Sequence, residues 1–403
     1  MAGVSIDHIV SVVVLLAAVL LFFGLFNQTL SVAVDYQRNT STAQECSNLL
    51  DAILLTPGVP TSGNPTMFGL QDPALSQYQL STFSLMRLNS LSSAPISYQK
   101  TGLTYSTITT SPNNYLLSPD SDVINYSTAL MLLGINGTYG FQLSLTPTVN
   151  ISIAEISTSP LTLSLNATGT GFPLANANVN CLLIPVYLNT SYPDFETIAN
   201  QMQTVETNSV GSASVTFSSF SLNPNLTYAF IAYAYDDGIT GVGYYQHPSV
   251  GNQSIVPFLG SLSTQSVTLA HSDDIPTNST LANTLHYNTT FILESQNYAV
   301  QETPMGSSNA FGNVTSGTGY SPVSISMGSY TPGILVIGYD GAGSNGVAMM
   351  PWGFSSLGFS LVFGGTPINQ KWIATDLRQV QINGVSYQAK LSLWSTQGYQ
   401  EAG

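Results

Sequence analysis

The chain has 403 residues, of which 43% are hydrophobic, so it is long enough to form two or three domains with buried cores. Charged residues make up only 6% of the sequence, against about 25% in an average soluble protein. Twenty Asp and Glu face six Lys and Arg, giving a net charge of −14, and because phosphate binding requires cationic side chains we expect no nucleic-acid partner.

The first predicted element is an apolar run from Ile9 to Phe26, interrupted only by Ser11. At about 1.5 Å per residue it spans roughly 27 Å, close to the hydrocarbon thickness of a bilayer. No basic residue precedes the run and no small-x-small cleavage site follows it, so we expect no cleavable secretory signal. A sparser apolar pattern continues to Leu55, where Thr56-Pro57-Gly58 provides a stop. The sequence therefore predicts a transmembrane and stalk helix over residues 1–57.

A turn-rich linker from Gly58 to Pro65 leads into a small mixed α/β region, expected over residues 58–147. Its clearest element is a helix from Asp120 to Gly134, with capping side chains at Asp120 and Asp122. The segment Tyr139–Leu145 alternates as a half-buried strand.

From residue 148 to 256 the hydrophobic pattern has a period of two, divided by Gly, Pro and Asn turns, which predicts a β-sandwich. The segment Phe172-Pro-Leu-Ala-Asn-Ala-Asn-Val179, followed by Gly211-Ser-Ala-Ser-Val-Thr-Phe217, resembles immunoglobulin-like modules of prokaryotic surface proteins. That resemblance implies a fold and no particular function.

Residues 257–403 are also β-patterned and are expected to form a C-terminal β domain. Ile334–Tyr339 is typical of a buried strand, and Asn383-Gly384 predicts a hairpin with a type I′ turn. The apolar stretch Gly353–Gly365 is too short and too rich in Gly and Ser for a second membrane span. The predicted fold class is thus mainly β: a long N-terminal helix, a small α+β region and β-sandwich domains.

No motif predicts catalysis. The GxGxxG from Gly341 to Gly346 follows a strand, but Pro351 and Gly353 come too soon for the helix that a dinucleotide site needs, so we expect a loop between strands. Calcium binding by Asp340 and Asn345 is a weaker alternative.

Three acidic pairs, at Asp120 with Asp122, Asp236-Asp237 and Asp273-Asp274, could be metal ligands or acid/base pairs. Helix capping explains the first pair and solvated turns explain the other two more simply. The four histidines show no zinc-type spacing; they are His8, His247, His271 and His286. We expect no enzyme activity, no cofactor and no metal site.

Two cysteines occur, Cys46 in the stalk and Cys181 in a predicted strand. They lie in segments that need not meet. Two buried free thiols are therefore favoured over a disulfide.

Twelve Asn-x-Ser/Thr sequons follow the apolar run and suggest an extracellular, N-glycosylated protein. They are at Asn27, Asn39, Asn125, Asn136, Asn150, Asn166, Asn189, Asn225, Asn252, Asn278, Asn288 and Asn313.

The segment Gly3-Val4-Ser5-Ile6-Asp7, followed by the apolar helix to Leu55, resembles the start of type IV pilin-like precursors, including archaeal pilins and archaellins. The resemblance implies processing after Gly3, a new N-terminus at Val4, and an Asp7 carboxylate that pairs with a neighbouring subunit's amine. The sequence departs from the pattern because no Lys or Arg precedes Gly3 and the acid is at the fourth position instead of the usual fifth. The stretch from Ser47 to Gly58 also looks like the stalk ends of archaeal single-span surface proteins.

These observations predict a structural cell-surface protein, a pilin-like filament or surface-assembly subunit that uses Ile9–Phe26 as a membrane or filament-core helix. Its partners would be copies of itself or other surface proteins, together with N-linked glycans. The main alternative is a membrane-anchored adhesin or ligand-binding ectodomain that does not polymerise. A surface-anchored hydrolase ranks third.

Overall fold

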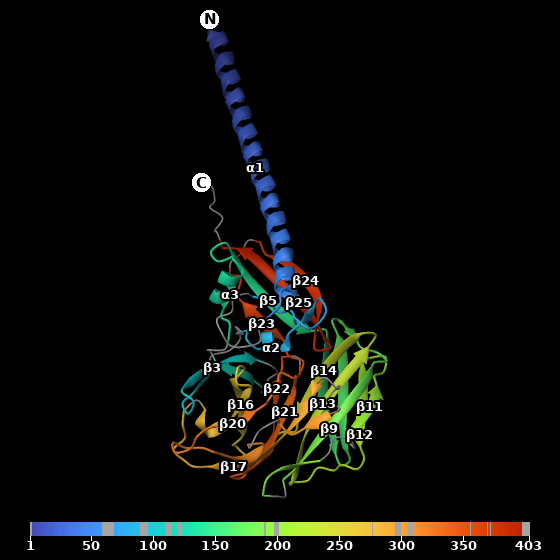
Figure 1. The fold of residues 1–403 in the computed structure, drawn as a ribbon. Coiled ribbons are helices and arrows are strands. Elements are labelled where there is room, and N and C mark those ends of the chain that lie inside the picture. Colours follow the sequence, from blue (N-terminus) through green and yellow to red (C-terminus); the bar gives the residue numbers. More distant parts are fainter. Residues whose placement is uncertain are drawn as a thin grey trace.

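The computed structural model describes residues 2–58, 68–88, 96–109, 115–119, 123–188, 191–196, 201–275, 277–294, 300–304, 309–354, 356–368, 370 and 372–396. A long N-terminal helix projects from a head made mostly of β-sheet (Figure 1). The predicted fold class, mainly β after a long apolar helix, is confirmed.

Helix α1 (Ala2–Leu55) is 54 residues long. Leu, Ala and other good helix formers fill much of it, and it ends two residues before Pro57, which lacks a backbone N–H and disfavours helical geometry in the residue before it. The expected stop at Thr56-Pro57-Gly58 is therefore confirmed.

The sheet nearest α1 has five strands, antiparallel except for the first pair. Their order is β1 (Gln79–Leu80), β24 (Ala374–Ile382), β25 (Val385–Ser395), β5 (Tyr139–Pro147) and β23 (Leu361–Gly364). Strands β24 and β25 form the predicted hairpin, with Asn383 and Gly384 at φ of 47° and 87°. Such left-handed values are what a type I′ turn needs at both positions. We call this sheet, with α2 (Thr82–Leu85), α3 (Tyr126–Leu132) and the end of α1, the helix-binding module.

Helix α3 is shorter than predicted. It begins after Asn125, whose Oδ1 accepts a hydrogen bond from the Thr128 N–H at 2.9 Å. Residues 120–122, the expected cap, lie outside the described residues. Asn is a preferred N-cap residue, so a start at Asn125 needs no help from the earlier aspartates. Gly134 has a φ of 70° and follows the helix, as predicted.

Residues 149–246 form two facing sheets. One has the order β12 (Ser212–Phe217), β7 (Leu161–Gly169), β6 (Val149–Thr158), with β8 (Phe172–Pro173) paired to β7. The other has the order β10 (Asp194–Phe195), β9 (Asn178–Tyr187), β13 (Leu226–Asp236), β14 (Ile239–Gln246), with β11 (Met202–Glu206) paired to β9. Apolar side chains from both sheets make a core between them, as a sandwich requires.

Two glycines let β14 lie close to β6. A Cβ at Gly241 would lie 2.5 Å from Val149 Cβ, and one at Gly243 would lie 2.6 Å from Ile151 Cβ. Because neither glycine has a side chain, β14 and β6 can pack against each other and close one side of the sandwich.

The remaining strands form three more sheets. A small one is β2 (Ile96–Tyr98), β3 (Leu103–Thr109), β4 (Tyr115–Pro119). The second is β15 (Ile255–Ser261), β16 (Ser266–His271), β20 (Val323–Ser326). The third is β18 (Val300–Glu302), β17 (Thr284–Leu293), β21 (Gly333–Gly341), β22 (Ser344–Trp352), with β19 (Phe311–Thr315) paired to β17. Tyr98 and Tyr105 of the small sheet pack against Phe258 of β15, with ring centroids 5.4 and 4.8 Å away.

Strand β9 is buried on both faces. Cys181 and Leu183 point into the sandwich core, whereas Leu182, Ile184 and Val186 join a larger core that also contains residues of β21 and β22. The sheet of β9 and β13 is therefore the middle layer of three, which explains its almost continuous apolar sequence.

The strand pairing crosses one of the expected domain boundaries. Strand β5, from the expected region 58–147, pairs with β25 and β23, from the expected domain 257–403. The C-terminal hairpin thus returns to the N-terminal helix, and the strands of residues 255–352 form a separate set. Hydrophobic period alone does not reveal which distant strands pair, and for that reason the division into consecutive blocks misses this return.

Candidate functional site

The most unusual surface of the molecule is the first half of α1. From His8 to Val34 every side chain is exposed, and the apolar ones in this segment include Leu21 at 67% and Leu15 at 65% exposure. An 18-residue window here has a mean hydropathy of 3.1 and none of it is buried. Figure 1 shows this part of the helix standing clear of every sheet. Monomeric soluble proteins rarely expose contiguous apolar surface of this extent, so this segment is the candidate functional site.

Aromatic residues mark the end of the apolar segment. Phe22 and Phe26 stack one turn apart, with ring centroids 6.3 Å from each other. Beyond them the exposed surface becomes polar, and Thr29 donates from its hydroxyl to the Leu25 carbonyl at 2.9 Å. The surface of the helix therefore changes from apolar to mostly polar at about residue 27.

The last turns of α1 are buried in the helix-binding module. Cys46, Leu50, Ile53 and Leu54 are fully buried and belong to the large core that includes β24 and β25. The Cys46 Sγ lies 3.6 Å from the Leu391 carbonyl oxygen, so the thiol packs directly on the C-terminal hairpin.

Polar contacts fix the same junction. Arg378 of β24 donates from Nε to Asp51 Oδ1 at 3.0 Å and from Nη2 to Asp51 Oδ2 at 3.3 Å. It also donates to Asp376 Oδ1 at 2.8 Å and to Ser47 Oγ at 3.0 Å. The Tyr78 hydroxyl donates to Asp51 Oδ1 at 3.2 Å. A bidentate guanidinium–carboxylate contact is directional, so it fixes how α1 is rotated about its own axis relative to the sheet.

Arg378 and Asp376 both have shifted pKa values in this junction. Hydrogen bonding to the Asp51 carboxylate raises the pKa of Arg378 above its ordinary value. Burial alone would raise the pKa of Asp376, but hydrogen bonds from Ser47 and the Leu377 N–H, together with Arg378, lower it below 3.8. The junction is thus built to keep Asp376 ionised.

The residues of the predicted processing site lie in the first turns of α1, at Gly3, Val4 and Asp7. Their side chains lie outside the described residues, so the predicted pairing of Asp7 with a neighbouring subunit stays a prediction.

The sequons fall into three groups. Exposed asparagines are Asn27, Asn125, Asn136, Asn150, Asn166, Asn225, Asn252 and Asn313. Partly buried ones are Asn39, Asn278 and Asn288. Asn189 lies outside the described residues. Asn288 is also engaged, because its Nδ2, the atom that would carry a glycan, donates to the Pro193 carbonyl at 2.9 Å.

The two cysteines are free and buried, as predicted, and they lie in different cores. Burial raises the pKa of Cys181 to about 12, so this thiol is unreactive.

The GxGxxG motif forms the tight turn between β21 and β22, with Gly341 paired to Ser344, so the predicted loop between strands is confirmed. Within the described residues no group of three or more His, Cys, Asp or Glu side chains is arranged to hold a metal ion. The Asp236-Asp237 pair lies at the hairpin turn between β13 and β14, in agreement with the simpler interpretation.

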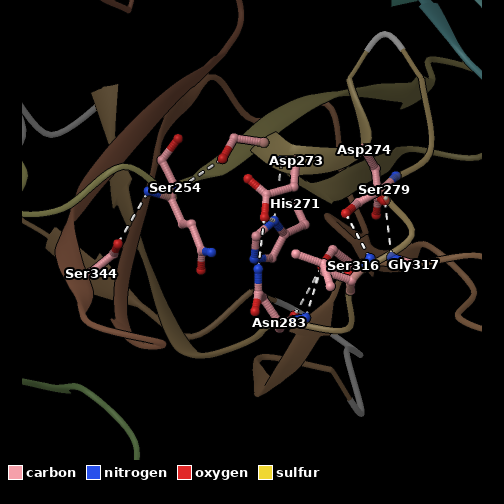
Figure 2. A network of polar contacts seen from close by, with 12 residues as sticks. Ser254, His271, Asp273, Asp274, Ser279, Asn283, Ser316, Gly317 and Ser344 are labelled. Atoms are coloured by element: carbon pink, nitrogen blue, oxygen red, sulfur yellow. Dashed lines mark hydrogen bonds and ion pairs between the residues drawn. The ribbon is translucent and has the colours of Figure 1, made fainter.

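The interpretation of Asp273-Asp274 as a solvated turn is wrong for Asp274. This carboxylate is fully buried and lies 2.6 Å from the Nζ of Lys100, whose side chain is 4% exposed. Its Oδ1 accepts from the backbone N–H groups of Ser279 and Gly317, each at 3.0 Å (Figure 2). Burial alone would raise the pKa of Asp274, but the hydrogen bonds and Lys100 lower it below 3.8.

Buried polar groups surround this pair. Asn283 donates from Nδ2 to Asp273 Oδ2 at 3.0 Å, and the Ser316 hydroxyl donates to the Leu281 carbonyl at 2.7 Å. His271 is fully buried, and burial lowers its pKa below 6.5. Figure 2 shows His271, Asp273, Asn283 and Ser316 close to one another. Because Lys100 is far away in sequence, only the tertiary structure reveals this network.

A second polar cluster lies on the sandwich. Glu155 Oε2 accepts from the Tyr228 hydroxyl at 2.6 Å and lies 3.1 Å from His247 Nδ1. His286 instead contacts Asn313, at 2.7 Å. His8 is exposed on α1. The described histidines therefore occupy four different surroundings.

No protein-family model matches the chain, and no curated protein matches it. Among solved structures, Escherichia coli alpha-2-macroglobulin in its native conformation aligns with 68% of this chain at 9% identity and a TM-score of 0.20. The same protein activated by porcine elastase aligns with 72% at 10% identity and a TM-score of 0.21. Red sea bream transglutaminase aligns with 62% at 10% identity and a TM-score of 0.18. The chain spans 19%, 29% and 37% of those chains, and these TM-scores are too low to indicate a common fold or function.

Proposed function

We propose that this protein is a structural subunit of the cell surface, in which the apolar part of α1 packs with the same segment of other copies to form the core of a pilin-like filament or surface assembly. The observation that carries the proposal is the complete exposure of an apolar helix on an otherwise well-packed chain. A surface of this kind needs either lipid or other helices around it.

The junction between α1 and the head supports the proposal. A subunit held in an assembly by its helix needs a head that cannot turn freely on that helix. The apolar contacts of Leu50 and Ile53 and the Asp51–Arg378 ion pair provide this fixed orientation.

The polar surface of the head fits an exterior position. Seven described sequon asparagines of the head are exposed, and N-linked glycans on them would extend into solvent. We place the head outside the cell, with Ile9–Phe26 in the membrane before assembly.

The first experiment is mass spectrometry of the mature N-terminus in protein taken from its native surface. A start at Val4 supports pilin-type processing. A start at Met1 or Ala2 contradicts processing after Gly3 and favours an uncleaved anchor.

A second experiment separates a filament from an anchor. Shearing of cells should release long polymers that pellet without detergent. If all of the protein stays with the membrane until detergent is added, the filament proposal fails.

The matched variants for this assay are Phe22→Ala and Thr40→Ala. Truncating Phe22 leaves an apolar span but removes packing volume between helices, so it should reduce the sheared polymer and leave membrane association unchanged. Thr40→Ala lies on the polar part of α1 and should change neither amount.

The second candidate function is a membrane-anchored adhesin or ligand-binding ectodomain that does not polymerise. One observation favours it: residues 27–45 continue the helix with mostly exposed, polar side chains. At about 1.5 Å per residue this part is roughly 28 Å long and would hold the head away from a bilayer. In that case Phe22→Ala changes neither the amount of protein released by shearing nor the amount that stays with the membrane.

A further inference from the structure

We propose that Lys100 and Asp274 become joined by an isopeptide bond between the lysine Nζ and the aspartate Cγ. The bond would link the turn between β2 and β3 to the short 3-10 helix Ser272–Asp274, which follows β16. The proposal does not depend on whether the protein forms a filament.

The first argument is proximity. The Nζ of Lys100 lies 2.6 Å from Asp274 Oδ2, and the two side chains are 4% and 0% exposed. Lysine and aspartate are almost never fully buried, and this chain has only three lysines. Two reacting groups held in contact inside a protein have a very high effective concentration.

The second argument is the surroundings of the carboxylate. Oδ1 accepts two backbone hydrogen bonds, from Ser279 and Gly317, each at 3.0 Å. Among the described residues, Oδ2 accepts no hydrogen bond of good geometry, and its contact is the ion pair with the Lys100 ammonium. The two oxygens are therefore different: one is polarised by two N–H groups and the other faces the amine.

The third argument is that the amine is held in place. The Nζ of Lys100 donates to the Thr315 carbonyl at 3.0 Å and lies 6.0 Å from the centre of the Tyr320 ring. A buried charge pair pays a large desolvation cost. Conversion of the two charges into a neutral amide removes that cost.

The reaction balances without a further reagent. The ammonium first transfers one proton to Oδ2, which leaves a neutral amine and a carboxylic acid. The nitrogen lone pair attacks Cγ, the C–N bond forms, and the carbonyl electron pair moves to Oδ1. There the N–H groups of Ser279 and Gly317 stabilise the negative charge, as in an oxyanion hole.

Collapse of this intermediate breaks the bond between Cγ and Oδ2. The oxygen leaves as water after taking a second proton from the nitrogen. One ammonium and one carboxylate thus give one amide and one water, with no change in net charge.

The test is the intact mass of the full-length chain, produced in detergent in a host without N-glycosylation and measured under denaturing conditions. The wild type should be lighter than its sequence mass by one water. Lys100→Arg keeps the positive charge but should show its full sequence mass. A wild type at full sequence mass overturns the proposal and leaves a buried ion pair.

Asp274→Asn gives a stricter check. An amide at this position would lose ammonia and form the same product, so the linked variant should have the same mass as the linked wild type. If Lys100→Arg or Asp274→Asn fails to fold, the wild-type mass together with the peptide map of the wild type still decides the question.

Chymotryptic digestion then locates the change. One branched peptide should contain both Lys100 and Asp274. Loss of water from a linear peptide, such as cyclisation at Asp237-Gly238, would overturn the proposal despite the correct total mass.

Discussion

Arg378 and Asp51 lie 327 positions apart in the sequence and meet through two hydrogen bonds at the point where α1 enters the head. The first long element and the penultimate strand of the chain are thereby joined.

The ion pair itself should contribute modestly to stability. In a double-mutant cycle with Asp51→Asn and Arg378→Gln, we expect a coupling free energy of about 1 kcal/mol, because both side chains are partly exposed and solvent screens them. Urea unfolding of the full chain in detergent measures it. Asp237→Asn, in an exposed turn, serves as the control and should change the unfolding free energy by less than about 0.5 kcal/mol. Coupling near zero would mean that the apolar contacts alone hold the helix.

Acid should weaken the same junction. The pKa of Asp376 is lowered in the folded protein, so the folded state prefers the ionised form. Its stabilising contribution is complete above the ordinary pKa of 3.8 and is lost as the pH falls through the lower folded value. Unfolding midpoints measured from pH 6 downwards should therefore decline only below the ordinary pKa. Asp376→Asn should flatten that decline, and an unchanged slope in the variant would contradict this assignment.

Removal of one buried hydroxyl should be tolerated or should stabilise the protein. Tyr387 is fully buried in β25, and its hydroxyl has no hydrogen-bond partner among the described residues. Tyr387→Phe removes this unpaired polar group without leaving a large cavity, so we expect a gain of up to about 1 kcal/mol in thermal or urea unfolding.

Tyr228→Phe is the matched control for that variant. Tyr228 is equally buried, but its hydroxyl donates to Glu155 at 2.6 Å. Its loss should destabilise the chain by about 1–3 kcal/mol, since the carboxylate loses a close donor. Equal effects of the two substitutions would argue against the difference in hydrogen bonding.

The close approach of β6 and β14 makes a further prediction. An alanine Cβ at position 241 would collide with Val149, so Gly241→Ala should destabilise the sandwich by about 1–3 kcal/mol. Gly319→Ala should change stability by no more than about 0.5 kcal/mol, because no atom lies within 4 Å of the added Cβ. Calorimetry of both variants checks the comparison, which fails if Gly241→Ala is neutral.

If the protein is N-glycosylated as we propose, glycan occupancy should follow the exposure of each asparagine. In protein from its native surface, glycopeptide mass spectrometry should find Asn150 and Asn166 occupied and Asn288 unmodified. The Nδ2 of Asn288 already donates to Pro193, whereas the other two side chains are exposed on one sheet of the sandwich. A glycan on Asn288 would contradict this prediction.

Local sequence patterns predicted local structure well. The helix stop at Pro57, the Asn383-Gly384 turn and the strand at Ile334–Tyr339 depend on neighbouring residues, and all three are present. In the strands that flank this turn, Val380 and Tyr387 are buried, in keeping with the period of two that strands show.

Such local patterns do not predict contacts between residues that are distant in sequence. A period of two accounts for Val179, Cys181 and Leu183 as one buried face of β9 but not for Leu182 and Ile184, which form a second one. The continuous apolar run in this strand was the available signal, because a strand with one solvent-exposed face would alternate apolar and polar residues. For Lys100 and Asp274 the only signal was the presence of a lone lysine in a chain that almost lacks them.

The return of β24 and β25 to α1 has a consequence for biosynthesis. A ribosome produces the buried face of Cys46, Leu50 and Ile53 early, but the hairpin of β24 and β25 that packs on it is made much later. At ordinary elongation rates the interval is on the order of tens of seconds. Until then the end of the helix lacks its contacts with the hairpin, and a product truncated before residue 374 never makes them. Closure of the junction therefore requires synthesis through β25, and proteolytic quality control could distinguish chains with and without this hairpin at this one place.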